Sequence, residues 1–68
     1  MTARELLRLL KRLGCTVTPG KGSHMKVQCG TCKTSIPAHA GEDIKLGTLR
    51  AIEKHLEPCL GKGWLARK

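Results

Sequence analysis

The chain has 68 residues, of which 13 are Lys or Arg and 5 are Asp or Glu, giving a formal net charge of +8. A chain of this length forms one domain at most and buries only about 60% of the surface that its unfolded form exposes. It has no room for a deep pocket around a large cofactor, so we expect no cofactor and chemistry on an open surface. The excess of positive charge favours polyanionic partners, and nucleic acid first.

Aromatic residues are almost absent from the sequence, which has no Phe, no Tyr and one Trp, Trp64. Proteins that bind single strands usually stack bases on several aromatic side chains of a sheet. An RNA contact made by this chain must therefore use phosphates, sugars and hydrogen bonds.

The first residues include an acidic side chain, and their Leu residues are interrupted by Arg and Lys. The sequence shows neither the uninterrupted apolar core of a signal peptide nor a segment that would span a membrane. We therefore expect a cytoplasmic location, no membrane partner and reduced thiols. The cysteines concerned are Cys15, Cys29, Cys32 and Cys59.

The N-terminal segment has the pattern of an amphipathic helix over residues 3–13. Thr2 and Glu5 are placed as a capping box, and Gly14 is suited to follow the last turn. The apolar face consists of Leu6, Leu9, Leu10 and Leu13, and beside it runs a basic stripe of Arg4, Arg8 and Lys11.

Two strands are expected after this helix. Residues 15–18 are rich in β-branched side chains, which is typical of a strand, and residues 19–22 form a loop with two glycines around Lys21. Residues 23–29 alternate between apolar and polar side chains, as in a strand with one buried face. The alternation places Met25, Val27 and Cys29 on one face and His24, Lys26 and Gln28 on the other.

A tight turn then leads into a third strand over residues 32–36. Gly30-Thr31 is a two-residue turn with Gly first, which suits a type II′ hairpin. The register that it sets is Cys29 opposite Cys32, Val27 opposite Thr34, Met25 opposite Ile36, Gln28 opposite Lys33, Lys26 opposite Ser35 and His24 opposite Pro37. The hairpin therefore has one mostly apolar face and one polar, basic face. The register of the first strand against the second is left open.

After the third strand the sequence indicates a loop over residues 37–46 and then a second helix. Ile44 and Leu46 lie in this loop, and their side chains are expected to be buried. Thr48 is expected to be the N-cap of the helix and Pro58 to end it. The apolar stripe of this helix consists of Leu49, Ile52 and Leu56.

The order of the elements is helix, three antiparallel strands, helix. Each helix has one apolar stripe and the sheet has one apolar face, so the economical packing puts both helices on that face. We therefore expect an α+β two-layer sandwich, α-β-β-β-α, of the double-stranded-RNA-binding-domain kind, whose other sheet face stays in water. Residues 1–58 form the domain and residues 59–68 a basic tail.

His24 is the leading candidate for chemistry, because the alternation puts it on the polar face. Gly22 and Ser23 precede it, and we expect Gly22 to allow the close approach of another backbone. Lys21 and Lys26 flank it. RNA carries its own nucleophile, the 2′-OH, so a His that removes this proton and a Lys that stabilises the phosphorane charge suffice without a metal.

Three segments carry a resemblance to a known family: Lys21-Gly22-Ser23-His24, Ile36-Pro37-Ala38-His39-Ala40-Gly41 and Leu46-Gly47-Thr48-Leu49-Arg50-Ala51-Ile52. In this order and spacing they resemble the HicA toxins, which pair with HicB antitoxins in bacteria and archaea. The resemblance implies the toxin of a type II toxin–antitoxin system, an mRNA interferase with a double-stranded-RNA-binding-domain-like fold. It also implies mRNA and a HicB-type antitoxin as partners. The implied catalytic residue is His24, and His39 maps to a nearby polar position. The residues expected to support RNA binding are Lys21, Gly22, Ser23, Lys26, Gln28 and His39.

Cys29-Gly30-Thr31-Cys32 is a competing motif, because Cys-x-x-Cys at a hairpin tip is half of a zinc knuckle. The candidates for the other half do not form a second tight pair: Cys15, His39, His55 and Cys59. The other interpretations are a redox-active pair or two packed thiols, and a disulfide would need an oxidising compartment.

Three functions are therefore compared. The leading one is a metal-independent endoribonuclease toxin that uses His24 as general acid and base and is held inactive by an acidic antitoxin. The second is a non-catalytic RNA-binding module of the same fold. The third is a zinc-ribbon-like nucleic-acid adaptor.

Overall fold

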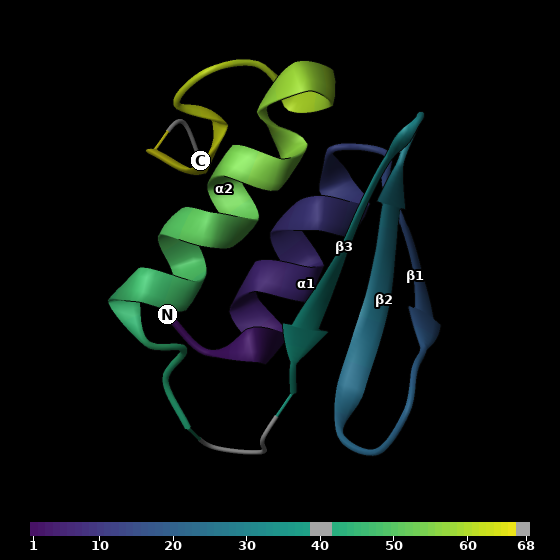
Figure 1. The fold of residues 1–68 in the computed structure, drawn as a ribbon, viewed down its shortest axis with the longest axis vertical. Coiled ribbons are helices and arrows are strands. Elements are labelled where there is room, and N and C mark those ends of the chain that lie inside the picture. Colours follow the sequence, from purple (N-terminus) through teal and green to yellow (C-terminus); the bar gives the residue numbers. More distant parts are fainter. Residues whose placement is uncertain (39–41, 67–68) are drawn as a thin grey trace.

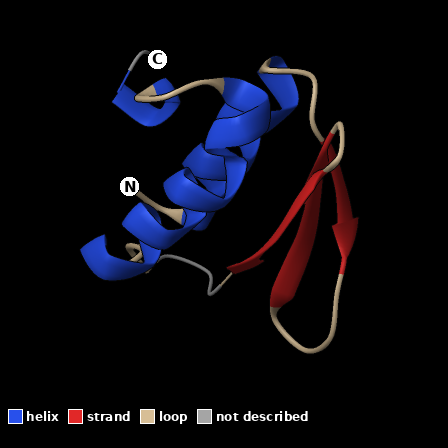
Figure 2. Ribbon diagram, turned by 45° about the horizontal axis from the view of Figure 1, so that its top comes forward, coloured by secondary structure: helices blue, strands red, loops and turns tan. Residues whose placement is uncertain are grey.

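The computed structural model describes residues 1–38 and 42–66, which form a three-stranded sheet with two helices on one side. In chain order the elements are α1 (Ala3–Arg12), β1 (Thr16–Pro19), β2 (His24–Cys29), β3 (Cys32–Pro37), α2 (Leu46–Leu60) and a 3₁₀ turn, η1 (Trp64–Ala66). The expected α-β-β-β-α order is confirmed (Figure 1). Figure 2 shows both helices against one face of the sheet, while neither covers the other face. Within the described ranges, no helix has the length and apolar character needed to cross a bilayer.

Helix α1 begins and ends where its sequence indicates. The backbone N–H of Glu5 donates to Thr2 Oγ1 at 3.2 Å, and the Thr2 N–H donates to Glu5 Oε1 at 2.9 Å, so the capping box is formed. Gly14 follows the helix with φ of +91°, a conformation that glycine adopts at little cost. Leu6, Leu9 and Leu10 are buried, so the helix presents its apolar face to the sheet. Leu13, which was expected on that face, is 44% exposed because it is the C-cap residue after the last turn.

The sheet is antiparallel in the order β1-β2-β3, and the hairpin between β2 and β3 has the register that its turn predicts, from His24 opposite Pro37 to Cys29 opposite Cys32. Gly30 has φ of +59° whereas Thr31 has no positive φ, as a type II′ turn requires. Strand β1 pairs with β2 so that Thr16 lies opposite Gln28 and Pro19 opposite Met25.

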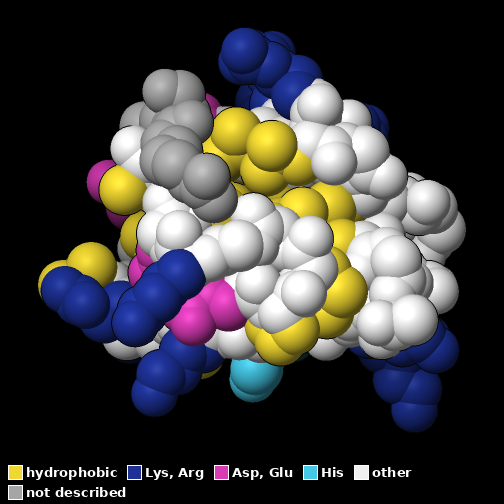
Figure 3. Space-filling view, turned by 90° about the horizontal axis from the view of Figure 1, so that it is seen from above, with side chains coloured by type: hydrophobic (Ala, Val, Ile, Leu, Met, Phe, Trp, Pro, Cys, Tyr) yellow, Lys and Arg dark blue, Asp and Glu magenta, His cyan; other side chains and the backbone are white. Residues whose placement is uncertain are grey.

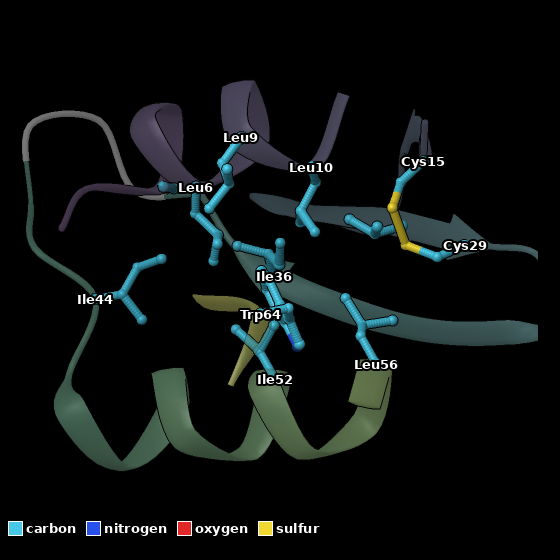
Figure 4. Close-up of a cluster of buried hydrophobic side chains, with 12 residues drawn as sticks. Leu6, Leu9, Leu10, Cys15, Cys29, Ile36, Ile44, Ile52, Leu56 and Trp64 are labelled. Atoms are coloured by element: carbon cyan, nitrogen blue, oxygen red, sulfur yellow. A yellow bond between two sulfur atoms is a disulfide. The ribbon is translucent and has the colours of Figure 1, made fainter. Parts of the chain in front are cut away.

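The core lies between the sheet and the helices (Figure 4). The sheet contributes Val27 and Ile36, and α2 contributes Ile52 and Leu56, all of which are buried. Trp64 from η1 is also buried, and its indole N–H donates to the Glu53 carbonyl at 2.9 Å. The chain beyond residue 58 therefore contributes a large side chain to the core.

The start of α2 differs from the expectation. The helix begins at Leu46 after the N-cap Lys45, and it has no side-chain cap, so the prediction of Thr48 as N-cap was wrong. The Leu49 N–H donates to the Lys45 carbonyl at 3.0 Å, which closes the first turn upstream of Thr48. Ile44 is buried as expected, but Leu46 is 66% exposed because it lies in the first turn of the helix and not in the loop.

The end of α2 also differs, because Pro58 lies inside the helix, which continues to Leu60. A proline in a helix interior removes one backbone hydrogen bond and costs about 3 kcal/mol. The helix nevertheless continues because Cys59 is bonded to Cys32 of β3 and the following turn brings Trp64 into the core. These tertiary contacts offset the local preference of proline.

The four cysteines form two disulfides, Cys15–Cys29 and Cys32–Cys59, so the expectation of reduced thiols was wrong. The interpretations of Cys29 and Cys32 as a zinc half-site, a redox-active pair or two packed thiols fail for the same reason, since each sulfur is bonded to a different partner. Cys15 precedes Thr16, which is opposite Gln28, and this register brings Cys15 next to Cys29. In the described part of the chain, no three His, Cys, Asp or Glu side chains are grouped so that they could hold a metal ion.

Candidate active site on the open sheet face

The Gly-Ser-His motif is a tight turn that ends on the first residue of β2. The His24 N–H donates to the Lys21 carbonyl at 3.0 Å, and Gly22 has φ of +59° while Ser23 has no positive φ. This is the pattern of a type II′ turn, in which the first central residue is best glycine. A Cβ atom on Gly22 would meet nothing within 4 Å, so the expected close approach of a backbone at Gly22 was wrong. The glycine serves the backbone conformation instead.

The close approach occurs at Gly20, where a Cβ atom would lie 3.1 Å from the His24 carbonyl oxygen. The Gly20 N–H donates to that oxygen at 2.9 Å, and the Ala38 N–H donates to the Ser23 carbonyl at 2.8 Å. The main chain at the start of β2 is therefore held from the β1 side and from the β3 side. Such a framework places the His24 side chain more firmly than a free loop would.

The His24 side chain is exposed on the uncovered face of the sheet, and its Nδ1 lies 3.4 Å from Ser35 Oγ. Ser35 is opposite Lys26, so it is a diagonal neighbour of His24 across the β2–β3 pair. This contact leaves Nε2 as the ring nitrogen that a substrate can use. Sequence reasoning had placed Ser35 on the polar face without giving it a role, although the hairpin register already put it beside His24.

We call this uncovered surface the open face. Two rows of polar side chains cross it beyond His24, with one residue from each strand: Thr18, Lys26 and Ser35 in the first row, and Thr16, Gln28 and Lys33 in the second. All six are exposed and together line a shallow groove with a volume of about 410 Å³. The groove has no acidic side chain in its lining, so it adds to the positive potential of the protein.

The predicted site residues are distributed unevenly around His24. Lys26 is two residues along the same face of β2, and Lys21 is exposed in the turn before it. Gln28 lies four residues away, about 13 Å along the strand, and its Nε2 donates to the Gly30 carbonyl at 3.2 Å. The open face therefore brings Lys26 close to His24 but not Gln28. His39 lies outside the described residues.

Positive charge is spread widely over the protein. Figure 3 shows Lys and Arg side chains projecting around the edge of the molecule, with Asp and Glu in smaller areas. The basic stripe of α1 is exposed as expected, and consists of Arg4, Arg8 and Lys11. Charge alone therefore does not single out one face, and the site is defined by His24 and the polar rows beside it.

A sequence model of the family described as the HicA toxin of bacterial toxin–antitoxin systems matches residues 3–57. The chain belongs to the HicA toxin family. The match includes α1, the whole sheet and most of α2, and so it contains the Gly-Ser-His turn. Searches of curated proteins and of solved structures found no match. Family membership gives this chain the role of a toxin, with a cognate antitoxin as its kind of partner.

In this HicA toxin the matched range ends before Cys59 and Trp64. The structure nevertheless joins Cys59 to β3 and buries Trp64 against the matched part. Cys59 and Trp64 thus stabilise the layer of helices behind the sheet, on the side away from His24.

Proposed function

We propose that this HicA toxin is an endoribonuclease that cleaves mRNA without a metal ion, with His24 as general base and general acid. The family match over residues 3–57 carries the proposal, because it assigns a toxin role to a chain whose exposed His24 lies beside Lys26 on an uncovered basic face. A phosphodiester in RNA has an adjacent 2′-OH, and a His with a neighbouring cation can act on it.

The proposed reaction begins when Nε2 of His24 removes the proton of the 2′-OH. The 2′-oxygen then forms a bond to phosphorus, and the bond from phosphorus to the 5′-oxygen breaks. The proton returns from His24 to the departing 5′-oxygen, directly or through water. The products are a 2′,3′-cyclic phosphate and a 5′-OH, and neither step requires a metal ion.

Two neighbours assist His24 in this proposal. Ser35 accepts a hydrogen bond from Nδ1–H at the 3.4 Å contact, which keeps the proton on Nδ1 and leaves Nε2 free to act as a base. Catalytic hydrogen bonds are often long before substrate binds, so this separation suits a resting enzyme. The ammonium group of Lys21, which is exposed in the turn before His24, stabilises the charge that builds up on the phosphorane oxygens.

We further propose that the cognate antitoxin is of the HicB type and that the toxin acts in the cytoplasm, where mRNA is found. Cytoplasmic thiols are mostly kept reduced. The two disulfides are therefore the part of this fold that depends most on the redox conditions of the compartment. The disulfides lie at the far end of β2 from His24, and the proposed chemistry does not involve them.

RNA cleavage by purified protein in the presence of EDTA tests the proposed activity. We expect His24→Gln to lower the cleavage rate by at least about 100-fold, as for the loss of a general acid–base group. The matched control is His55→Gln, since His55 is also exposed but lies on α2 and contacts Thr34. It should cleave like the unchanged protein. RNA ends that carry a 5′-phosphate and disappear with EDTA would refute the mechanism. RNA binding without cleavage by the unchanged protein would favour a non-catalytic RNA-binding module.

A further inference from the structure

The open face continues past His24 toward the turn between β2 and β3 and supplies more polar groups than the reaction needs. We propose that this groove binds a single RNA strand by its backbone, with two successive phosphates beyond the cleaved one held by Lys26 and Lys33. This inference rests on the proposed function and adds to it the path of the substrate. It also gives a role to Lys33, Thr16 and Thr18, which take no part in the proposed chemistry.

The chemistry of the groove favours a polyanion. Its two charged side chains are both lysines, Lys26 and Lys33. Its other polar residues carry hydroxyls or an amide: Thr16, Thr18, Thr34, Ser35 and Gln28. Hydroxyl, amide and ammonium groups are among the side-chain groups that contact phosphate and sugar. With no carboxylate in the lining, nothing in the groove repels a phosphate.

The spacing of the two rows fits an extended strand. Successive residues on one face of a β-strand are about 6.7 Å apart, close to the repeat of an extended sugar–phosphate backbone. Lys26 lies one row beyond His24, and Lys33, opposite Gln28, lies two rows beyond it. A strand whose cleaved phosphate is at His24 therefore presents its next two phosphates to these two lysines in turn.

The groove suits one strand of RNA better than a duplex or DNA. Its volume of about 410 Å³ is at the lower end of the range for small-ligand pockets, so it holds a short stretch of backbone and not a helix. Thr16 and Thr18 offer hydroxyls to the 2′-OH, the group that distinguishes RNA from DNA. The amide N of Gln28 is bonded to the Gly30 carbonyl, which turns its oxygen into an oriented acceptor for another 2′-OH. The absence of Phe and Tyr from the sequence removes base stacking there, so we expect little sequence preference from the groove.

The test measures binding separately from cleavage. All variants carry His24→Gln in the full chain, so that RNA stays intact, and fluorescence anisotropy follows oligouridylates of two, four and six nucleotides. We expect affinity to rise from two to four nucleotides, and Lys33→Gln to remove the part of this gain that the second additional phosphate supplies, while the part supplied at Lys26 remains. Lys33→Gln should also reduce the slope of log affinity against log salt by about 0.7, which corresponds to one phosphate contact on a single strand.

Two matched variants make the result specific. Lys54→Gln removes a lysine that is also exposed but belongs to α2, on the other side of the sheet, and should leave the salt slope unchanged. Thr18→Val keeps the shape of the side chain and should reduce the preference for oligouridylate over oligodeoxyuridylate. Equal effects of Lys33→Gln and Lys54→Gln on affinity and on the salt slope would overturn the proposal that the groove binds RNA. Loss of antitoxin binding in Lys33→Gln with unchanged RNA binding would also overturn it, by showing that the groove holds a protein.

The outcome for the groove is independent of the outcome for cleavage. If the unchanged protein cleaved RNA but Lys33→Gln did not alter RNA binding, the proposed endoribonuclease activity would stand and the proposed RNA-binding role of the groove would be refuted. If RNA binding depended on length and on Lys33 but the unchanged protein did not cleave RNA, the RNA-binding role of the groove would stand and the endoribonuclease activity would be refuted.

Discussion

Cys29 and Cys32 lie opposite each other across the β2–β3 pair, yet each is bonded to a different cysteine. Cys29 is joined to Cys15 just before β1, and Cys32 is joined to Cys59 near the end of α2. The tip of one hairpin is thus tied to the first strand and to the second helix. His24 is at the other end of β2, so the disulfides brace the fold from the end away from the proposed chemistry.

We expect loss of the Cys32–Cys59 disulfide to lower stability strongly without changing the site. A disulfide between cysteines that are 27 residues apart stabilises the folded state by about 3–4 kcal/mol. The whole free energy of unfolding of a domain of this size is roughly 3–10 kcal/mol. Cys32→Ser combined with Cys59→Ser should therefore lower Tm by more than about 10 °C. Thermal unfolding followed by circular dichroism measures the shift, and cleavage at low temperature should persist in the folded fraction. A Tm equal to that of the unchanged protein would show that helix packing alone holds α2 in place.

Ser35 is expected to act as a positioning residue for His24. Ser35→Ala removes the contact to Nδ1, and a hydrogen bond of about 0.5–1.5 kcal/mol corresponds to a fall in kcat of about 2- to 10-fold. KM should change little, because the contact is to His24 and not to the substrate. Ser35→Thr restores a hydroxyl and should recover most of the lost kcat. A rise in KM together with a fall in kcat in both variants would instead indicate a general disturbance of the open face.

Gly22 and Gly47 form a matched pair for testing the turn before His24. A Cβ atom would meet nothing within 4 Å at either position, but only Gly22 has a positive φ. Gly22→Ala should destabilise the protein by about 1–3 kcal/mol through backbone strain. Gly47→Ala lies in the first turn of α2 and should stabilise it by about 0.4–1 kcal/mol. Urea unfolding measures both, and a destabilising Gly47→Ala would contradict this assignment of strain.

The parts of the fold that follow local rules could be predicted from the sequence. The Gly30-Thr31 turn fixed every pair of the β2–β3 hairpin, and Thr2 with Glu5 fixed the start of α1. From that register the proximity of Ser35 to His24 also follows, since both lie on one face in diagonal positions. The polar face was predictable because alternation along a strand needs no tertiary information.

The errors arose where distant contacts override local preference. A proline usually ends a helix. After Pro58, however, the disulfide from Cys59 to β3 keeps the chain helical for two further residues. The cysteine pairing was not predictable because four cysteines allow three connectivities, and the nearest pair in sequence is not bonded. A close approach to another backbone was expected at Gly22 but occurs at Gly20, which faces His24 of β2. The motif alone does not show which of the two glycines faces another strand.

The antitoxin is expected to inhibit by covering the open face around His24. The groove beside His24 is shallow, so a partner blocks the working surface by covering it. The apolar face of the sheet is already occupied by α1 and α2 (Figure 2). The open face is basic, and an acidic partner would gain from charge complementarity and from steered association.

This covering model predicts different effects for three kinds of variant in a kinetic binding experiment with the purified antitoxin. Lys21→Glu and Lys26→Glu should weaken the complex mainly through a lower association rate, because charge on the open face steers the encounter. His24→Ala should bind nearly as well as the unchanged toxin and should fold normally, because the side chain is exposed. Charge reversal on the α1 stripe, at Arg4, Arg8 and Lys11, should have the smaller effect, because that stripe lies on the helix behind the sheet. If the stripe variants broke the complex while Lys21→Glu and Lys26→Glu bound normally, the antitoxin would grip α1 and act on His24 from a distance.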